Sequence, residues 1–223
     1  MMLLYKMEKA KFSFGRTIRT FGRTHGKKLS ARQLYLTDVV LPTLAPKPND
    51  VNGAILEIGF GSGEHLIELA LSHPDKIIIG AEPFINGVAG LMSKISDDKN
   101  KIRDEYKNIR IFPDDIRIFL AKFAGQFSLI YILHPDPWPK ARHEKRRLLS
   151  AEFLKTLTTF IMPDGAIIIG TDHTDYYNWI LEQVARTNLT IKSRDLETIK
   201  TRYQEKNMFG SDKTMYLVLS YTL

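Results

Sequence analysis

A glycine-rich loop is the first part of this chain whose residue types and spacing suit a ligand. It reads Glu57-Ile58-Gly59-Phe60-Gly61-Ser62-Gly63 and ends a run of apolar residues. Closely spaced glycines let the backbone turn tightly and approach a ligand at the N-terminus of the helix that follows. Several classes of ligand are bound by such loops, so Gly59, Gly61 and Gly63 indicate a site without selecting what it binds.

Acidic residues stand where the next predicted strands end. Glu82 comes about 20 residues after the loop, where a carboxylate can accept from both ribose hydroxyls or else cap a helix. Of the pair Asp114-Asp115 we expect one to cap the next helix and Asp115, by register, to bind an adenine amino group. An acid at Glu57 ahead of G-x-G-x-G is more typical of an S-adenosylmethionine site than of a dinucleotide site.

A third group of residues combines an acid, an aromatic ring and a basic run. In Pro135-Asp136-Pro137-Trp138-Pro139 the prolines stiffen the chain, so Asp136 and Trp138 have little conformational entropy left to lose. Placed after a strand, this loop could position a base and the cations could hold its phosphates. Trp138 could either stack on that base or pack in the core, and the sequence leaves both alternatives open. The cations are Lys140, Arg142, Lys145, Arg146 and Arg147.

The positive charge is concentrated at the N-terminus. The 223 residues carry a net charge of +7, and residues 1–28 hold eight Lys or Arg against a single acid, Glu8, so this segment alone accounts for the excess. A basic arm of this kind could meet a polyanion, and a solvated tail or a transit peptide are the other interpretations.

Composition excludes several classes of protein. The chain has no cysteine, which excludes disulfide scaffolds and thiolate chemistry and fits a reducing cytoplasm. It has no apolar run long enough to span a membrane. The six His and the acids show no compact ligand spacing. We therefore expect a cytoplasmic protein with no metal and no membrane partner.

Strands and helices are predicted to alternate along the chain, which builds right-handed βαβ units. The expected fold class is α/β, a doubly wound, mostly parallel sheet covered on both faces, and ligands bind beyond the carboxyl ends of its strands. Residues 1–50 are expected to form the basic arm and a connector, and residues 51–223 the domain. Strands are expected at 54–59, 76–82, 109–112, 127–133, 166–170 and 215–223, and helices at 63–71, up to about 95, and at 115–123, 145–160 and 176–187.

These motifs together resemble those of the bacterial-type tRNA (guanine-N7-)-methyltransferases. The resemblance implies a class I S-adenosylmethionine-dependent methyltransferase with a Rossmann-like, seven-stranded sheet. Its most specific part is Pro135-Asp136-Pro137-Trp138 with the basic run behind it. The other matching positions are 16–33, 56–61, Glu82, Asp115, Thr171-Asp172 and Thr201-Arg202-Tyr203-Gln204.

The resemblance also implies roles for single residues. Glu57, Glu82, Asp115 and Asp136 would contact S-adenosylmethionine, with Asp136 at the catalytic position. This sequence departs from the family pattern at Gln204, where the family has Glu and this chain has Glu205 one step later, and at His134, where we expect an aromatic such as Phe. Contacts to the RNA would come from Lys140, Asp172, Thr201, Arg202, Tyr203 and Gln204.

The implied reaction transfers a methyl group to N7 of a guanosine in the variable loop of tRNA and forms 7-methylguanosine. Guanine N7 carries a lone pair and no proton, so no general base is needed. Trp138 and Tyr203 are candidates to stack on the base. One alternative is a methyltransferase for another RNA, a protein or a small molecule; a protein or small-molecule substrate leaves the basic arm and the cluster 140–147 without a role. The other is an RNA-binding protein without catalysis, which predicts binding without turnover.

Overall fold

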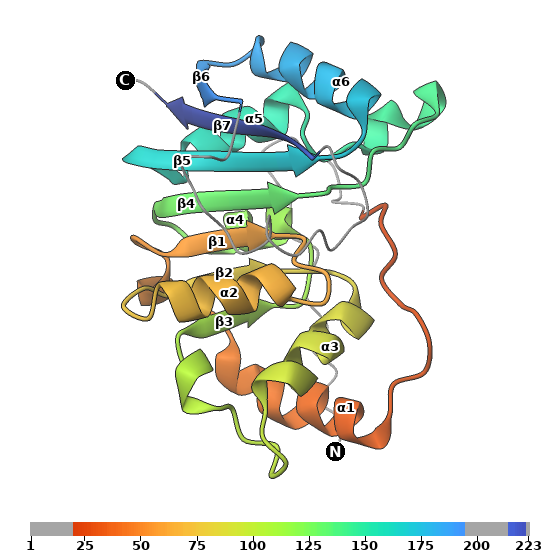
Figure 1. Cartoon of the computed structure of the whole chain (residues 1–223), viewed down its shortest axis with the longest axis vertical. Helices are drawn as coiled ribbons and strands as arrows, with labels where there is room; N and C mark the ends of the chain where they lie inside the picture. The colour runs from red at the N-terminus through yellow and green to blue at the C-terminus, as the bar shows by residue number, and fades with distance from the viewer. Residues whose placement is uncertain (1–19, 195–213, 222–223) are drawn as a thin grey trace.

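Seven strands form one sheet in the order β3-β2-β1-β4-β5-β7-β6 within residues 20–194 and 214–221, which the computed structural model describes (Figure 1). The neighbours from β3 to β5 run parallel, and β7 is antiparallel to both β5 and β6. The strands are β1 (Ile55–Ile58), β2 (Ile78–Ala81), β3 (Ile109–Phe112), β4 (Phe127–Leu133), β5 (Ile161–Thr171), β6 (Leu189–Ser193) and β7 (Met215–Tyr221).

Helices cover both faces of the sheet. α2 (Glu64–Ser72) and α3 (Ile85–Ile95) pack on one face, where Leu66 and Leu91 are fully buried. α4 (Ile116–Lys122), α5 (Ala151–Thr158) and α6 (Thr174–Val184) pack on the other with Phe119, Leu154 and Ile180. Figure 1 shows α2 in front of the sheet and α4 and α5 behind it. The predicted fold class, a doubly wound and mostly parallel α/β sheet, is confirmed.

The strand registers bring the predicted site together. Ile58 of β1 pairs with Ala81 of β2 and Ile132 of β4, and Ala81 pairs with Phe112 of β3. The carboxyl ends of these four strands therefore lie at one edge, so the loops that follow them meet there.

Among the differences from the sequence prediction, two concern the helix before β5 and a strand near the C-terminus. The helix predicted at 145–160 is wrong in its first part, because residues 141–146 form a 3-10 turn, η5 (Ala141–Arg146), and Arg147 is extended. Ser150 then caps α5 by accepting from the N–H of Phe153. The strand that the pattern does not predict is β6, a short edge strand in which only Leu189 is buried.

Residues before position 51 contribute to the core. After the short α1 (Ala31–Tyr35), the chain continues through a π-helical turn, η1 (Leu36–Val40), and a 3-10 turn, η2 (Leu41–Leu44). Leu36, Leu41 and Leu44 are buried in the same apolar cluster as α2 and α3. Before α1, residues 20–28, which we call the strap, run from the carboxyl edge of the sheet down the right side of the molecule in Figure 1. Two further short 3-10 turns are η3 (Pro48–Asp50) and η4 (Asp104–Tyr106).

Candidate functional site

A cleft of about 1290 Å³ opens at the carboxyl edge of the sheet. It extends from the ends of β1, β2 and β4 to the first turns of α4 and α5 and to one side of α6, and part of the strap lines it. Of the residues predicted from the sequence, the cleft is lined by Gly59, Glu82, Asp115 and Asp136. The sheet thus brings together one residue from each of four loops that are far apart in the sequence.

The glycine loop needs glycine for two different reasons. Gly59, Gly61 and Gly63 have φ angles of 77°, 55° and 80°, in the left-handed region that other residues rarely adopt. A Cβ at Gly63 would lie 2.6 Å from the Leu91 side chain, whereas a Cβ at Gly59 or Gly61 would meet no atom within 4 Å. Gly63 therefore serves helix packing, and Gly59 and Gly61 serve the shape of the loop beside the open cleft.

A fourth glycine, which the sequence motif does not include, supports the loop from α3. A Cβ at Gly87 would lie 2.3 Å from the carbonyl oxygen of Gly61. The N-terminal turn of α3 can approach the loop only because Gly87 has no side chain. In the sequence, Gly87 is a single glycine within an amphipathic helical pattern, and that pattern does not predict the contact with the Gly61 carbonyl.

Glu82 joins the loops after β1 and β2. Its Oε2 accepts from the N–H of Gly61 at 2.8 Å, and its Oε1 accepts from the N–H of Phe84 at 2.8 Å. Burial raises the pKa of the Glu82 carboxyl above its ordinary value; these two N–H groups lower it in part, and the charges of Asp136 and Glu57 raise it further. A carboxylate offers about four acceptor positions, so each oxygen retains one for a ligand.

Asp115 is the N-cap of α4, so the expectation that the capping acid is the other member of the pair is wrong, whereas the adenine contact of Asp115 stays a prediction. Its Oδ1 accepts from the N–H of Arg117 and from Arg117 Nε, and its Oδ2 accepts from Arg117 Nη2 and the hydroxyl of Thr20. Burial alone would raise the pKa of Asp115, but the hydrogen bonds and charge of Arg117, with the Thr20 hydroxyl, outweigh it and lower the pKa. Asp114 accepts from the Asp115 N–H.

Glu57 lies behind the cleft lining. It is 3% exposed, and its Oε1 lies 3.2 Å from Nδ1 of His65 on α2. Its Oε2 is buried and has no hydrogen-bond partner in the structure. Tyr131 of β4 packs edge-on to His65, and burial together with the Glu57 charge raises the pKa of the Tyr131 hydroxyl to about 12. Glu57 therefore lies in the interior beside His65 of α2 and does not line the cleft.

The loop Pro135–Trp138, which we call the PDPW loop, is held in an unusual conformation. His134 and Trp138, on either side of Pro-Asp-Pro, have φ angles of 48° and 42°, a region that costs energy for residues other than glycine. Asp136 between them is exposed at the cleft. The Trp138 ring packs against His143, with ring centroids 5.8 Å apart, and under the Arg146 guanidinium at 5.0 Å.

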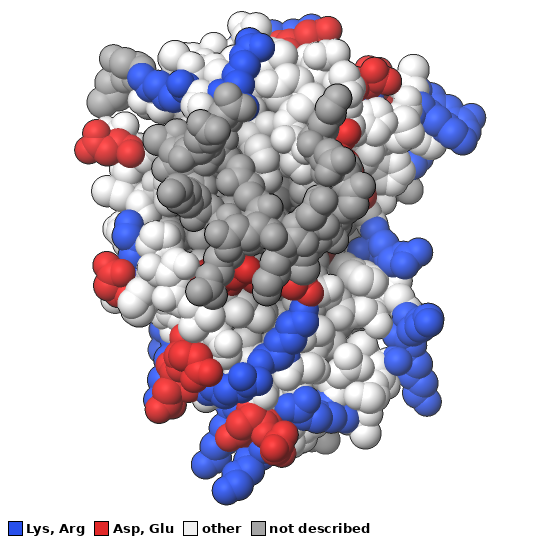
Figure 2. All heavy atoms as spheres, in the orientation of Figure 1, with Lys and Arg blue, Asp and Glu red and all other residues white. Residues whose placement is uncertain are grey.

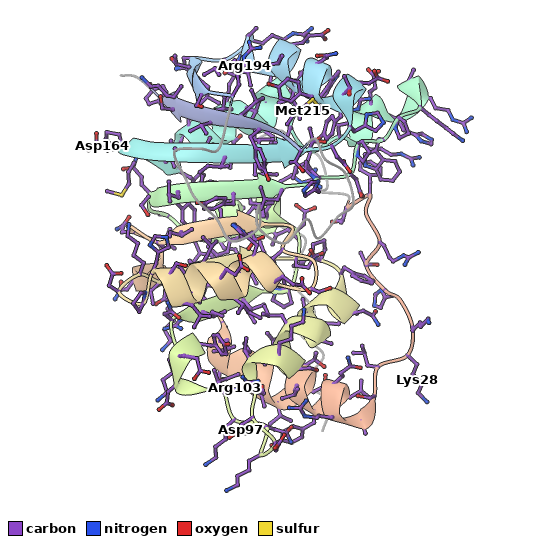
Figure 3. The ribbon with its side chains drawn as sticks, viewed as in Figure 1. Lys28, Asp97, Arg103, Asp164, Arg194 and Met215 are labelled. Carbon is purple, nitrogen blue, oxygen red and sulfur yellow. The ribbon has the colours of Figure 1, made fainter. Side chains whose placement is uncertain are left out.

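Of the residues predicted to contact RNA, the structure describes Lys140 and Asp172. Lys140 is exposed at the N-cap of η5. Asp172 follows β5, and its Oδ1 lies 3.8 Å from His134 Nδ1. Thr201, Arg202, Tyr203 and Gln204 lie outside the described residues. The chain is described again from residue 214, and Met215, labelled in Figure 3, pairs with Thr171 at the carboxyl end of β5.

The strap contributes residues that sequence reasoning did not assign to the site. Thr20 bonds Asp115, and the Arg146 guanidinium lies 5.5 Å from the Phe21 ring as well as over Trp138. Farther along, the Ile85 N–H donates to the carbonyl of Thr24. The strap is thus fastened to both sides of the cleft. Its signals in the sequence are its charge and the family resemblance over positions 16–33, and neither predicts these particular contacts.

Basic side chains line one edge of the molecule. Figure 2 shows them at the right of the view, where Figure 1 draws the strap and, above it, η5. Lys28 projects away from the body of the protein (Figure 3). The exposed cations of this edge, which we call the basic rim, are Arg23, Lys27, Lys28, Lys140, Arg142 and Lys145.

Residues 20–194 and 214–221 contain no group of three or more His, Asp or Glu side chains arranged to hold a metal ion. No helix in these ranges is long and apolar enough to cross a membrane.

Comparisons with known proteins agree with the geometry of the cleft. The model of a family described as "Putative methyltransferase" matches residues 52–211. A tRNA (guanine-N(7)-)-methyltransferase of Neorickettsia sennetsu is 31% identical over 202 residues, 90% of this chain and 88% of the relative. The enzyme of the same name from Ruegeria pomeroyi is 37% identical over 212 residues, 83% of this chain and 87% of the relative.

Solved structures share the fold at low sequence identity. The 16S rRNA methyltransferase KamB has a TM-score of 0.53 at 12% identity, covering 79% of this chain and 91% of that one. An antibiotic-related methyltransferase has a TM-score of 0.54 at 14% identity, covering 88% and 97%. These likenesses show a class I methyltransferase fold.

Proposed function

The chain belongs to the family of tRNA (guanine-N(7)-)-methyltransferases, and from that premise we propose that it transfers a methyl group from S-adenosylmethionine to N7 of a guanosine in tRNA. The observation that carries this proposal is the cleft itself. Glu82, Asp115 and Asp136 converge on it from three strand ends, beside the glycine loop and below the basic rim. The product is 7-methylguanosine, and the proposed location is the cytoplasm.

The residues on the cofactor side fit S-adenosylmethionine. Glu82 retains an acceptor position on each oxygen for the two ribose hydroxyls. Gly59 and Gly61 leave open space where a Cβ would otherwise project. Glu57, in β1 directly before that loop, has a buried Oε2 with no hydrogen-bond partner in the structure, and this oxygen is proposed as a further acceptor. Asp115 borders the cleft at the position proposed for adenine.

Methyl transfer to guanine N7 requires electrostatic stabilisation of a positive charge rather than a general base. When bound, S-adenosylmethionine supplies a methyl group on a positively charged sulfur, and guanine N7 has a lone pair ready to accept it. Asp136 and Glu82 are close enough for the Asp136 charge to raise the pKa of Glu82. Both carboxylates thus favour a cation in the cleft. Asp136 is the proposed catalytic residue because it lines the cleft from a stiff loop and is the more exposed of the two.

The substrate side fits an RNA. The basic rim provides six exposed cations along one edge, which can neutralise phosphates of a large polyanion. Lys140 belongs to that rim, and Asp172 lies at the cleft mouth. Thr201, Arg202, Tyr203 and Gln204 are proposed to complete the RNA contacts. A small-molecule substrate would give the rim no role.

Incubation of the protein with labelled S-adenosylmethionine and unmodified tRNA tests the proposal. Digestion to nucleosides should give labelled 7-methylguanosine and no other labelled nucleoside. A tRNA whose target guanosine is replaced by adenosine is the matched control and should remain unlabelled. Label in another nucleoside would reassign the substrate. Binding of tRNA without label transfer would indicate an RNA-binding protein without catalysis.

A further inference from the structure

Arg147 differs from the other cations of the basic run. Lys140, Arg142 and Lys145 are exposed and Arg146 is half-buried, whereas Arg147 is only 8% exposed. A guanidinium withdrawn from solvent to this degree cannot act as an open phosphate site. Burial of a charge is costly unless it is hydrogen-bonded or paired, so the contacts of Arg147 indicate what it does.

The guanidinium of Arg147 is bonded to the backbone of the PDPW loop. Its Nε donates to the carbonyl of Pro137 at 2.8 Å, and its Nη2 lies 3.5 Å from the carbonyl of Trp138. These two carbonyls are the first ones after Asp136 in the chain. The planar fork of an arginine can address two neighbouring acceptors at once, which a lysine cannot do.

The Arg147 guanidinium also packs on two aromatic rings of α6. Its central carbon lies 5.3 Å from the ring centroid of Tyr176 and 5.0 Å from that of Trp179, both on α6. Tyr176 is fully buried in the core. The Nη1 of Arg147 also lies 3.9 Å from Glu144 Oε1. Arg147 therefore connects α6 to a loop that has residues in the strained left-handed region at Trp138 and, directly before it, at His134.

We propose that Arg147 is a positioning residue, which holds the PDPW loop on α6 so that Asp136 stays at the cleft. Arg147 lines the cleft, but its guanidinium is engaged by the loop carbonyls and by the rings of α6, so its proposed role is exerted through Asp136. The inference rests on the proposed function, because it gives the held carboxylate a role in methyl transfer. Misplacing a catalytic group by about 1 Å can cost about 100-fold in rate, so a loosened loop should affect turnover more than binding.

Turnover is measured first, under single-turnover conditions with saturating cofactor and tRNA. Arg147→Met keeps an apolar stem between the rings and removes both bonds to the loop, and the rate should fall about 10- to 100-fold. Affinities for S-adenosylmethionine and tRNA should change less than about 3-fold. Arg147→Lys, which is the milder variant, should recover part of the rate.

Arg110→Met is the matched control for loss of a structural arginine. Arg110 lies near the amino end of β3, far from the cleft edge, and its Nε donates to Asp50 at 3.1 Å. This variant should lower the melting temperature and leave the single-turnover rate of the folded protein unchanged. If Arg147→Met behaves like Arg110→Met, the positioning role is overturned.

A double-mutant cycle with Asp136→Asn separates positioning from an independent role. If Arg147 acts through Asp136, Arg147→Met should add little to the loss already caused by Asp136→Asn. Fully additive losses would overturn the inference. So would a fall of about 0.7 to 0.9 in the slope of log tRNA affinity against log salt, which would make Arg147 a phosphate contact.

A fluorescence experiment tests the loop without relying on activity. The chain has two tryptophans, so a Trp179→Phe background leaves Trp138 of the PDPW loop as the only one. Adding Arg147→Met should increase acrylamide quenching of Trp138, and unchanged quenching would overturn the inference. If the parent protein makes no 7-methylguanosine, the proposed function fails on its own while this experiment still decides whether Arg147 holds the loop.

Discussion

The two sides of the cleft are built differently. On the side of β1 and β2, Glu82 is bonded to backbone N–H groups of two neighbouring loops, and the glycines shape the rest. On the side of β4 and β5, side chains from distant parts of the sequence hold an exposed Asp136 in a strained loop. The first side is organised by the sheet itself, whereas the second depends on contacts that substitution can loosen one at a time.

This difference suits two different ligands. A cofactor that is the same in every turnover can be met by a fixed backbone cradle. A tRNA is large and must deliver one base into the cleft, so the opposite side carries the exposed acid Asp136 and the basic η5 turn. Breaking the two sides separately should therefore affect different steps of the reaction.

The largest effect is expected at the tip of the substrate side. Asp136→Asn keeps the shape of the side chain and removes its charge, so the single-turnover rate should fall by about 100-fold or more. Folding and affinity for tRNA should survive, because the basic rim is untouched. Glu105→Gln, on the exposed η4, is the matched control and should have the parental rate. A near-parental rate for Asp136→Asn would leave positioning alone as the contribution of the loop.

The next largest effect is expected on the cofactor side. Glu82→Ala should weaken S-adenosylmethionine binding by about 1.5 to 3 kcal/mol, because the ribose hydroxyls lose a charged acceptor. The same change leaves the N–H groups of Gly61 and Phe84 without their partner, so the melting temperature should also fall. Calorimetry on the folded variant measures the affinity. Unchanged affinity would remove Glu82 from the cofactor site.

The contrast also explains what the sequence could predict. Glu57, the glycine loop and Glu82 are recognisable because strand ends in a parallel sheet fall at one edge and local spacing then fixes the neighbours. The sequence pattern overestimates the length of α5, because the basic run before it consists of good helix formers although the backbone at Arg147 is extended. The contacts of Arg147 with Tyr176 and Trp179 join parts of the chain that are far apart in the sequence, and no local pattern encodes them.

Two further contacts show the same limit. Thr20 is 95 positions from Asp115 in the sequence, yet its hydroxyl completes the partners of that carboxylate. Gly87 looks like a weak residue in a helix, and only the approach of the Gly61 carbonyl explains it. Charge and periodicity identified the arm and the helix, but neither encodes which distant atom they meet.

A moderate effect is expected from the charge of Asp115, and it depends on pH. The pKa of Asp115 is lowered in the folded protein, so its carboxylate contributes stability above the ordinary range near pH 4, and this is lost as the pH falls through the lowered pKa. Asp115→Asn keeps a good N-cap and removes the ion pair with Arg117, so unfolding free energy at pH 7 should fall by about 1 kcal/mol. Urea unfolding should show the difference between variant and parent shrinking below about pH 4. A difference that is independent of pH would contradict this account.

Glu82 should show the opposite trend, which sharpens the comparison within the cofactor side. Its pKa is raised in the folded protein, so its ionisation costs stability as the pH rises above the ordinary value of about 4.3. Its hydrogen bonds to Gly61 and Phe84 are a separate, structural contribution.

The smallest effect is expected where the strap meets the cofactor side. Four donors already surround the Asp115 carboxylate, which has about four acceptor positions, so an adenine amino group must displace one of them. The Thr20 hydroxyl is the one uncharged side-chain donor among them. Thr20→Val removes this competitor, so S-adenosylmethionine should bind about 2- to 5-fold more tightly, in line with the net value of one neutral hydrogen bond. Thr24→Val, with an exposed hydroxyl near His25, is the matched control and should have the parental affinity. If Thr20→Val instead weakens cofactor binding, the strap holds Asp115 in place for the ligand, and the cofactor side would share the dependence on distant side chains that marks the PDPW loop.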